Sequence, residues 1–232
     1  MAVERFFPQR AELHSALAKA IAERVEAAVA ERGAAGLVVT GGSTPAPLYD
    51  ALTQIDAPWD KATITLSDER WVETDSPASN EGLVRRRLLQ GHAAAAQLVG
   101  LKTDAASPAE ALPDLEAALA AVPAPYEVVV LGMGGDCHIA SLFPGAPELE
   151  AAFDAGRGER AIAIHRPGAD GSSERVSLTL RALLDTRLVV ILIEGDSKRE
   201  AYARALTAEP KDAPVAALLQ QTDVPVEIWW AP

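Results

Sequence analysis

The chain has 232 residues, of which 49% are hydrophobic, and this is enough apolar material to bury the core of a large globular domain. Its formal net charge of -12 opposes non-specific binding to nucleic acid or to an anionic membrane, because like charges repel. The single cysteine, the lack of a secretory leader pattern and the lack of any apolar run of about 18 residues lead us to expect a cytoplasmic protein with no membrane span.

Helix and strand patterns alternate along most of the chain. Apolar residues at four-residue spacing predict an amphipathic helix over residues 9–32 that ends near Gly33. The predicted strands cover residues 37–40, 63–67, 127–132, 161–165, 175–180, 187–195 and 226–230. Further helices are predicted over residues 46–55, 79–90, 109–121, 197–207 and 213–220.

This alternation is typical of an α/β fold. We expect a Rossmann-like, three-layer structure in which a mostly parallel central sheet carries helices on both faces. The segment 144–175 is rich in Pro and Gly and contains a GADGSS loop, so we expect irregular structure and a small extra lobe there. One domain over residues 1–232 accommodates all of these elements.

The motif GGSTP, residues 41–45, directly follows a predicted strand. Its glycines permit a tight turn, Ser43 or Thr44 can cap the next helix, and Pro45 suits the first turn of that helix. Free backbone N–H groups at such a turn bind anions, so Gly42, Ser43 and Thr44 are candidate substrate-binding residues. A plain strand-to-helix turn explains the motif equally well, and the spacing matches no nucleotide-binding fingerprint.

The motif SDERWV, residues 67–72, follows the next strand. Asp68, Glu69 and Arg70 place two acids and one guanidinium at a single strand end. An arginine there can hold a carboxylate or an oxyanion through paired hydrogen bonds, so Arg70 is a candidate catalytic residue and Asp68 a candidate substrate-binding residue. A surface ion-pair cluster is the common alternative explanation.

The segment 126–145 runs an apolar strand into a glycine-rich bend, at the edge where open α/β sheets bind their ligands. His138 lies in this bend and can accept a proton from water, so it is the candidate base, with Asp136 as a candidate to orient its ring or the substrate. Among the other histidines, His14 is expected on a polar helix face, and His165 is the one competitor.

Cys137 lies next to His138 and invites comparison with thiol nucleophiles. Adjacent side chains usually project in different directions, and the chain contains no GxSxG motif to position a nucleophile. We therefore expect Cys137 only to occupy a position in the bend. Asp136 and His138 have no further metal-ligating residues nearby in sequence, so we expect no metal site.

A phosphorylated ligand would need a local basic cluster, since the chain as a whole is acidic. Arg175 begins one predicted strand, and Lys198 lies at the start of a helix, where Gly195 and Ser197 offer a helix N-terminus. Together with the GGSTP turn, these two cations would form a phosphate pocket. Other arginines are expected on solvated helix faces: Arg85, Arg86, Arg87, Arg181 and Arg199.

Five segments carry a family resemblance: GGSTP, SDERWV with SNEG, LGMGGDCHIASLFPG, ERVSLTLRAL and EGDSKREA. In order and approximate spacing they resemble the 6-phosphogluconolactonase family over most of the chain. The resemblance implies hydrolysis of 6-phospho-D-glucono-1,5-lactone to 6-phosphogluconate in the oxidative pentose phosphate pathway, without a cofactor or a metal. It also implies that His138 is the catalytic histidine and that Arg70, Arg175 and Lys198 line the substrate pocket.

The mechanism we predict is direct attack of water on the lactone. His138 would act as base and then as acid to the ring oxygen, while Arg70 or backbone N–H groups of residues 132–135 would hold the oxyanion. Two residues depart from the family pattern GxDGHTASLFP, because Cys137 replaces a glycine and Ile139 a threonine. If φ is positive at residue 137, cysteine costs free energy there, but neither change removes a group assigned to proton transfer.

Two other functions stay open. A glucosamine-6-phosphate deaminase or isomerase of the same fold fits HIA at residues 138–140, whereas the following SLFPG and the shorter chain favour the lactonase. A sugar-phosphate sensor would bind the same ligand without turnover. We expect a monomer that acts on a small phosphorylated sugar lactone and has no nucleic-acid or membrane partner.

Overall fold

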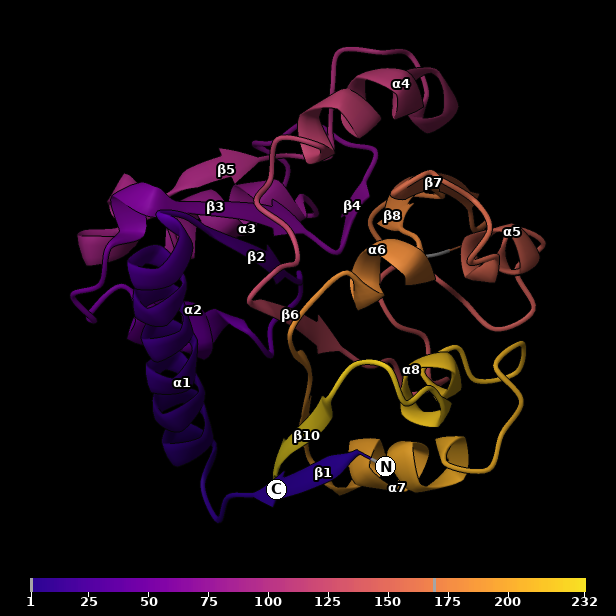
Figure 1. The fold of residues 1–232 in the computed structure, drawn as a ribbon. Helices are drawn as coiled ribbons and strands as arrows, with labels where there is room; N and C mark the ends of the chain where they lie inside the picture. Colours follow the sequence, from indigo (N-terminus) through magenta and orange to yellow (C-terminus); the bar gives the residue numbers. More distant parts are fainter. Residues whose placement is uncertain (1, 169) are drawn as a thin grey trace.

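The computed structural model describes residues 2–168 and 170–232. Its centre is a seven-stranded sheet in which all the paired neighbours run parallel (Figure 1). From one edge to the other, the strands are β1 (Val3–Phe6), β10 (Val226–Ala231), β9 (Val189–Glu194), β6 (Val128–Gly132), β2 (Ala35–Val39), β3 (Ala62–Leu66) and β5 (Gln97–Val99). The prediction of a mostly parallel central sheet is confirmed.

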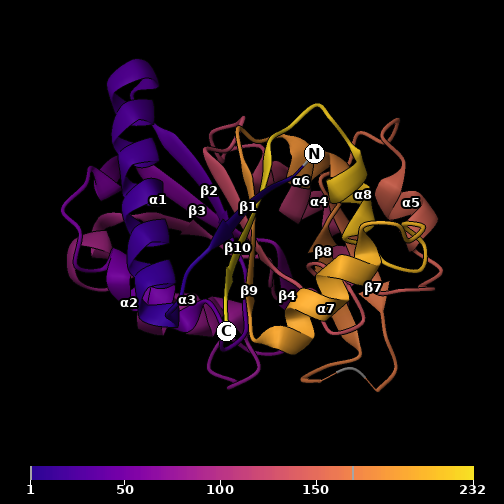
Figure 2. The ribbon, with the colours of Figure 1, turned by 90° about the horizontal axis from the view of Figure 1, so that it is seen from below.

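Helices cover both faces of this sheet, as predicted. Helices α1 (Arg10–Arg32) and α2 (Ala46–Leu52) lie on one face, and α7 (Asp196–Ala205) and α8 (Ala216–Gln220) lie on the other (Figures 1 and 2). The four-residue spacing in α1 works as expected, because the apolar stripe is buried against the sheet. Its members are Leu13, Leu17, Ile21 and Val25.

The prediction for His14 was wrong. His14 is buried, and its Nε2 lies 2.7 Å from Oε1 of Glu194, at the end of β9. Residue 14 is one position from the apolar stripe, and a stripe that packs on a sheet is about 100° wide, so this neighbour is covered as well. A histidine can be buried here because the carboxylate of Glu194 supplies a hydrogen-bond partner.

A second, three-stranded antiparallel sheet forms the small extra lobe that the sequence predicted. It consists of β4 (Asp68–Arg70), β8 (Glu174–Leu178) and β7 (Ala161–His165). In Figure 1, β7 and β8 lie beside α5 (Leu149–Phe153) and α6 (Leu180–Leu184). Strands β7 and β8 cannot be parallel neighbours in a sheet, because the short loop between them is enough only for an antiparallel hairpin.

The remaining elements connect these layers. Helix α3 (Asn80–Arg87) begins as predicted at Ser79, whose hydroxyl accepts a hydrogen bond from the Gly82 N–H at 3.0 Å. Helix α4 (Pro108–Leu119) precedes β6, and two 3-10 turns are η1 (Trp59–Lys61) and η2 (Gly91–Ala95). Strands β1, β4 and β5 were not predicted. Among the described residues, no helix is long and apolar enough to cross a membrane.

Candidate active site

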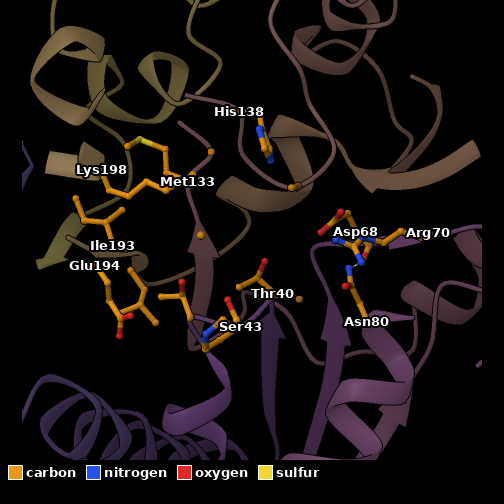
Figure 3. A pocket seen from close by; sticks show the side chains of 18 of the residues that line it. Thr40, Ser43, Asp68, Arg70, Asn80, Met133, His138, Ile193, Glu194 and Lys198 are labelled. Carbon is orange, nitrogen blue, oxygen red and sulfur yellow. Dashed lines mark hydrogen bonds between the residues drawn. The ribbon is translucent and has the colours of Figure 1, made fainter. Parts of the chain in front are cut away.

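A cavity of about 330 Å³ lies at the carboxyl ends of the central strands, between the main sheet and the small lobe (Figure 3). The edge where parallel strands end is where open α/β sheets bind ligands, because the loops that follow the strands converge there. Eight of the nine predicted site residues line this cavity, and the ninth, Asp136, touches one of them. The eight are Gly42, Ser43, Thr44, Asp68, Arg70, His138, Arg175 and Lys198.

The ring of His138 projects into the cavity from the loop after β6 (Figure 3). Its Nδ1 lies 2.6 Å from Oδ1 of Asp136, and this hydrogen bond lowers the pKa of Asp136 to about 2. Asp136 is therefore ionised at neutral pH and can only accept, so Nδ1 carries the proton. In the neutral ring, the lone pair then lies on Nε2, where a base needs it.

Replacing Asp136 by Asn should lower kcat by roughly 10–100-fold, because the amide can also donate to Nδ1 and favour the wrong tautomer. Since the pKa of Asp136 is about 2 in the folded protein, below its ordinary value, its stabilising effect exists above about pH 4 and disappears as the pH falls through 2. The melting-temperature difference between the wild type and Asp136→Asn should therefore shrink as the pH falls from about 4 to about 2. A difference that stays unchanged down to about pH 2 would contradict the lowered pKa of Asp136.

The loop that follows β6 folds tightly over Gly134, which leaves no room for a side chain at this position. A Cβ at this position would overlap the His138 ring and the Asp136 carboxylate. The Gly134 N–H donates to the His138 carbonyl at 2.9 Å, which closes the loop. This N–H is therefore used inside the loop, which removes one of the backbone donors predicted for an oxyanion in residues 132–135.

Cys137 occupies the bend in the left-handed backbone region, with φ of 67°. Its side chain is buried away from the cavity, and Sγ lies 3.3 Å from the Ala201 carbonyl in α7. Burial raises the pKa of the thiol, so it stays protonated and is a poor nucleophile. The expectation that Cys137 only occupies a bend position agrees with this geometry.

Replacing Cys137 by Gly should keep or raise the rate of turnover. Glycine removes about 1–2 kcal/mol of left-handed strain, and the lost burial of a small side chain offsets most of that gain. The melting temperature should accordingly move by only a few degrees, as measured by calorimetry beside steady-state kinetics. Loss of turnover in Cys137→Gly would instead implicate the thiol.

Asp68 lies on the opposite wall of the cavity from Lys198 (Figure 3). Its two carboxylate oxygens accept hydrogen bonds from the Ser67 hydroxyl at 2.9 Å and from the Ser141 hydroxyl at 2.6 Å. The Asn80 amide, which the sequence did not single out, donates to the Asp68 carbonyl at 2.9 Å and also lines the cavity. This network fixes one wall of the site.

Arg70 and Arg175 face each other across β4 and β8 as paired residues. Arg175 is 4% exposed and donates to the carbonyls of Ser172 and Asp170, while Arg70 donates to the Ala78 carbonyl at 2.6 Å. Within residues 2–168 and 170–232, neither guanidinium has a carboxylate partner within 4.0 Å. Burial, and then the charge of Arg70, lower the pKa of Arg175.

Like charges on directly paired strand residues are destabilising, so the fold tolerates a cost at this pair. Two buried or half-buried guanidinium groups beside a cavity attract an anion, and their planar forks suit a carboxylate or a developing oxyanion. The sequence grouped Arg175 with Lys198, but the structure places Arg175 beside Arg70.

Glu69 holds the segment that carries Arg70. Its carboxylate is fully buried and accepts hydrogen bonds from the backbone N–H groups of Arg70, Asn80 and Glu81 and from the Ser79 hydroxyl, at 2.7–3.0 Å. Burial raises the pKa of Glu69, and the three backbone N–H donors oppose that shift. The sequence suggested a surface ion-pair cluster as the alternative here, and the burial of Glu69 excludes it.

The GGSTP turn and Lys198 form another side of the cavity (Figure 3). The capping prediction for Ser43 and Thr44 was wrong, because Pro45 is the N-cap of α2 and the Ser43 carbonyl already closes a turn with the Ala46 N–H at 3.3 Å. Within the described part of the chain, neither hydroxyl has a protein partner. Both residues line the same cavity as Lys198, whose ammonium donates to the Met133 carbonyl at 2.7 Å.

Phe143 packs beside two of the residues that line the cavity, His138 and Arg175. Its ring lies 4.6 Å from the His138 ring, and the Arg175 guanidinium lies 5.4 Å from its centroid. An aromatic face attracts cations, so this ring fits beside the arginine and beside a protonated imidazole. His165, the competing histidine, lies outside the cavity and pairs with Glu174.

Comparison with known proteins decides the family. A model of glucosamine-6-phosphate isomerases and 6-phosphogluconolactonases matches residues 8–230. The chain belongs to this family. A 6-phosphogluconolactonase of Mesorhizobium japonicum is 42% identical over 97% of this chain and 94% of its own length. A second, from Caulobacter vibrioides, is 42% identical over 97% of this chain and 95% of its own.

The solved structures of the family include close structural matches. The crystal structure of a 6-phosphogluconolactonase from Shewanella baltica has a TM-score of 0.96 and 37% identity, and it covers 100% of this chain and 98% of its own. A monomeric glucosamine-6-phosphate deaminase has a TM-score of 0.76 at 19% identity, covering 97% of this chain and 96% of its own, which shows the shared fold.

Proposed function

We propose that the protein hydrolyses 6-phospho-D-glucono-1,5-lactone to 6-phosphogluconate, the lactone step of the oxidative pentose phosphate pathway. The observation that carries this proposal is one cavity that combines a carboxylate-oriented imidazole, His138, with the cations Arg70, Arg175 and Lys198. Relatives named 6-phosphogluconolactonase, with 42% identity over nearly the whole chain, support the same substrate.

The two sides of the cavity suit different parts of this substrate. Lys198 provides a point charge, and the hydroxyls of Ser43 and Thr44 line the same cavity beside the exposed turn at Gly42, so we assign the phosphate to these groups. The paired forks of Arg70 and Arg175 bind the lactone carbonyl, where negative charge develops. Fixing the phosphate orients the carbonyl toward the base, so that remote binding energy assists the reaction.

His138 then activates water. Nε2 takes a proton from the water as its oxygen forms a bond to C1 of the lactone, and the carbonyl oxygen becomes an oxyanion beside Arg70. The C1–ring oxygen bond breaks as the oxyanion collapses, and the imidazolium returns its proton to the ring oxygen. The product is an open-chain acid with a hydroxyl at C5. Asp136 keeps the imidazole in the required tautomer throughout.

The test is an assay of lactone hydrolysis. The protein is added to freshly generated lactone, and the release of acid is measured and compared with the spontaneous rate. The same preparation is assayed for ammonia release from glucosamine 6-phosphate, which a deaminase would show and a lactonase would not. A protein that binds 6-phosphogluconate without either activity would be a sensor. Every residue of the scheme comes from one chain, so we propose a monomeric active species, acting in the cytoplasm where its phosphorylated substrate is retained.

A further inference from the structure

A second cavity, of about 530 Å³, lies between α2 and α3 and adjoins the catalytic cavity. The two cavities share four lining residues, so they lie side by side along a common wall. The shared residues are Gly42, Ser43, Arg70 and Asn80, and the others are Ala46, Pro47, Pro77, Ser79, Leu83, Arg86 and Arg87. We call this second cavity the outer groove.

On the α3 side of the outer groove, Arg86 is the one arginine that the described residues leave without an ion pair. Three consecutive arginines lie on α3: Arg85 donates to Glu81 at 2.8 Å, and Arg87 donates to Asp50 at 2.6 Å. Within the residues that the structure describes, Arg86 has neither an acidic nor a hydrogen-bonding partner, and it is exposed on the groove wall. No pattern in the sequence separates Arg86 from its two neighbours.

Arg70 adds a second positive charge to the same path. It borders both cavities, and its Nε is buried without a hydrogen-bond partner among the described residues. Among the described residues its guanidinium has no carboxylate within 4.0 Å, so its charge adds to that of Arg86 along the groove. The two arginines thus mark a route of positive charge on a protein whose net charge is -12.

We propose that the outer groove is a capture site for phosphate monoesters, in which Arg86 binds the phosphate of the sugar phosphate before the ligand enters the catalytic cavity. This inference rests on the proposed function for the identity of the ligand. The phosphate of the substrate is a dianion that the protein as a whole repels, so a local positive field at the entrance raises the association rate. Because Arg86 lies outside the catalytic cavity, a change of its charge should leave the chemical step there unaltered.

The experiment compares Arg86→Glu with a matched charge reversal, Lys19→Glu, on the exposed face of α1 outside both cavities. At low ionic strength, Arg86→Glu should lower kcat/KM for the lactone about tenfold with kcat nearly unchanged, and the loss should shrink as added salt screens the charge. Arg86→Lys should restore kcat/KM, because it restores the charge. Lys19→Glu should reduce kcat/KM by less than twofold.

The association rate of 6-phosphogluconate, followed by stopped-flow tryptophan fluorescence, gives a second readout that needs no turnover. It should fall about tenfold in Arg86→Glu and stay near the wild-type value in Lys19→Glu. Equal losses in the two variants, or a loss that salt does not change, would overturn the capture site. The remaining outcome separates the two proposals. If the wild type binds 6-phosphogluconate about tenfold faster than Arg86→Glu but does not hydrolyse the lactone, the proposed function is overturned and the capture site is not.

Discussion

Replacing His138 by Gln is expected to lower kcat for lactone hydrolysis by about 10²–10⁴-fold, the usual contribution of a positioned general base. The glutamine amide is similar in reach and can still donate to Asp136, whose carboxylate lies 2.6 Å from Nδ1 in the wild type. It cannot accept a proton from water, however. Affinity for 6-phosphogluconate, measured by calorimetric titration, should change by less than about threefold, because His138 is not assigned to the phosphate.

His165→Gln is the matched control for this variant. The His165 ring pairs with Glu174 on the hairpin of the small lobe and lies outside the catalytic cavity, so its loss should leave kcat within about twofold of the wild type. If His138→Gln keeps the wild-type kcat, or if His165→Gln loses it, His138 is not the general base.

Replacing Lys198 by Met is expected to raise KM for the lactone by about 10–100-fold. A charge-assisted hydrogen bond contributes roughly 1.5–3 kcal/mol, and about 1.4 kcal/mol corresponds to a factor of ten in affinity. The methylene chain of methionine retains the packing of the lysine stem beside Met133. Steady-state kinetics at saturating and subsaturating lactone separate the effect on KM from the effect on kcat.

Lys211→Met supplies the control, because Lys211 is an exposed lysine that does not line the cavity. Its KM should equal that of the wild type within about twofold. Lys198→Arg should recover part of the affinity, since it restores the charge with a different hydrogen-bond geometry. An unchanged KM in Lys198→Met would place the phosphate elsewhere, and the paired arginines would then be the alternative site.

The sequence was sufficient to predict the central sheet because its strands are short apolar runs between amphipathic helices. It was also sufficient to bring most of the site together, since residues after parallel strands meet at one edge of the sheet. The GGSTP turn, His138 and Lys198 all follow strands in this way. Their side chains line one cavity although they are far apart in the chain.

The rest depended on contacts that no local pattern encodes. Strand β4 has only three residues, and it leaves the direction of β3 to pair with β8 more than 100 positions away. Nothing in SDERWV indicates that Arg70 faces Arg175. The burial of His14 depended on Glu194, which lies 180 positions away. Each of these is decided by tertiary packing, which overrides local preference.

The buried carboxylate of Glu69 has a consequence for the kinetics of binding. It joins β4, the following loop and the start of α3 through four hydrogen bonds that exist before any ligand arrives. Arg70 is attached to that rigid segment, so its guanidinium needs no disorder-to-order transition when the lactone enters. Ordering of this wall should accordingly not limit the rate at which the ligand associates.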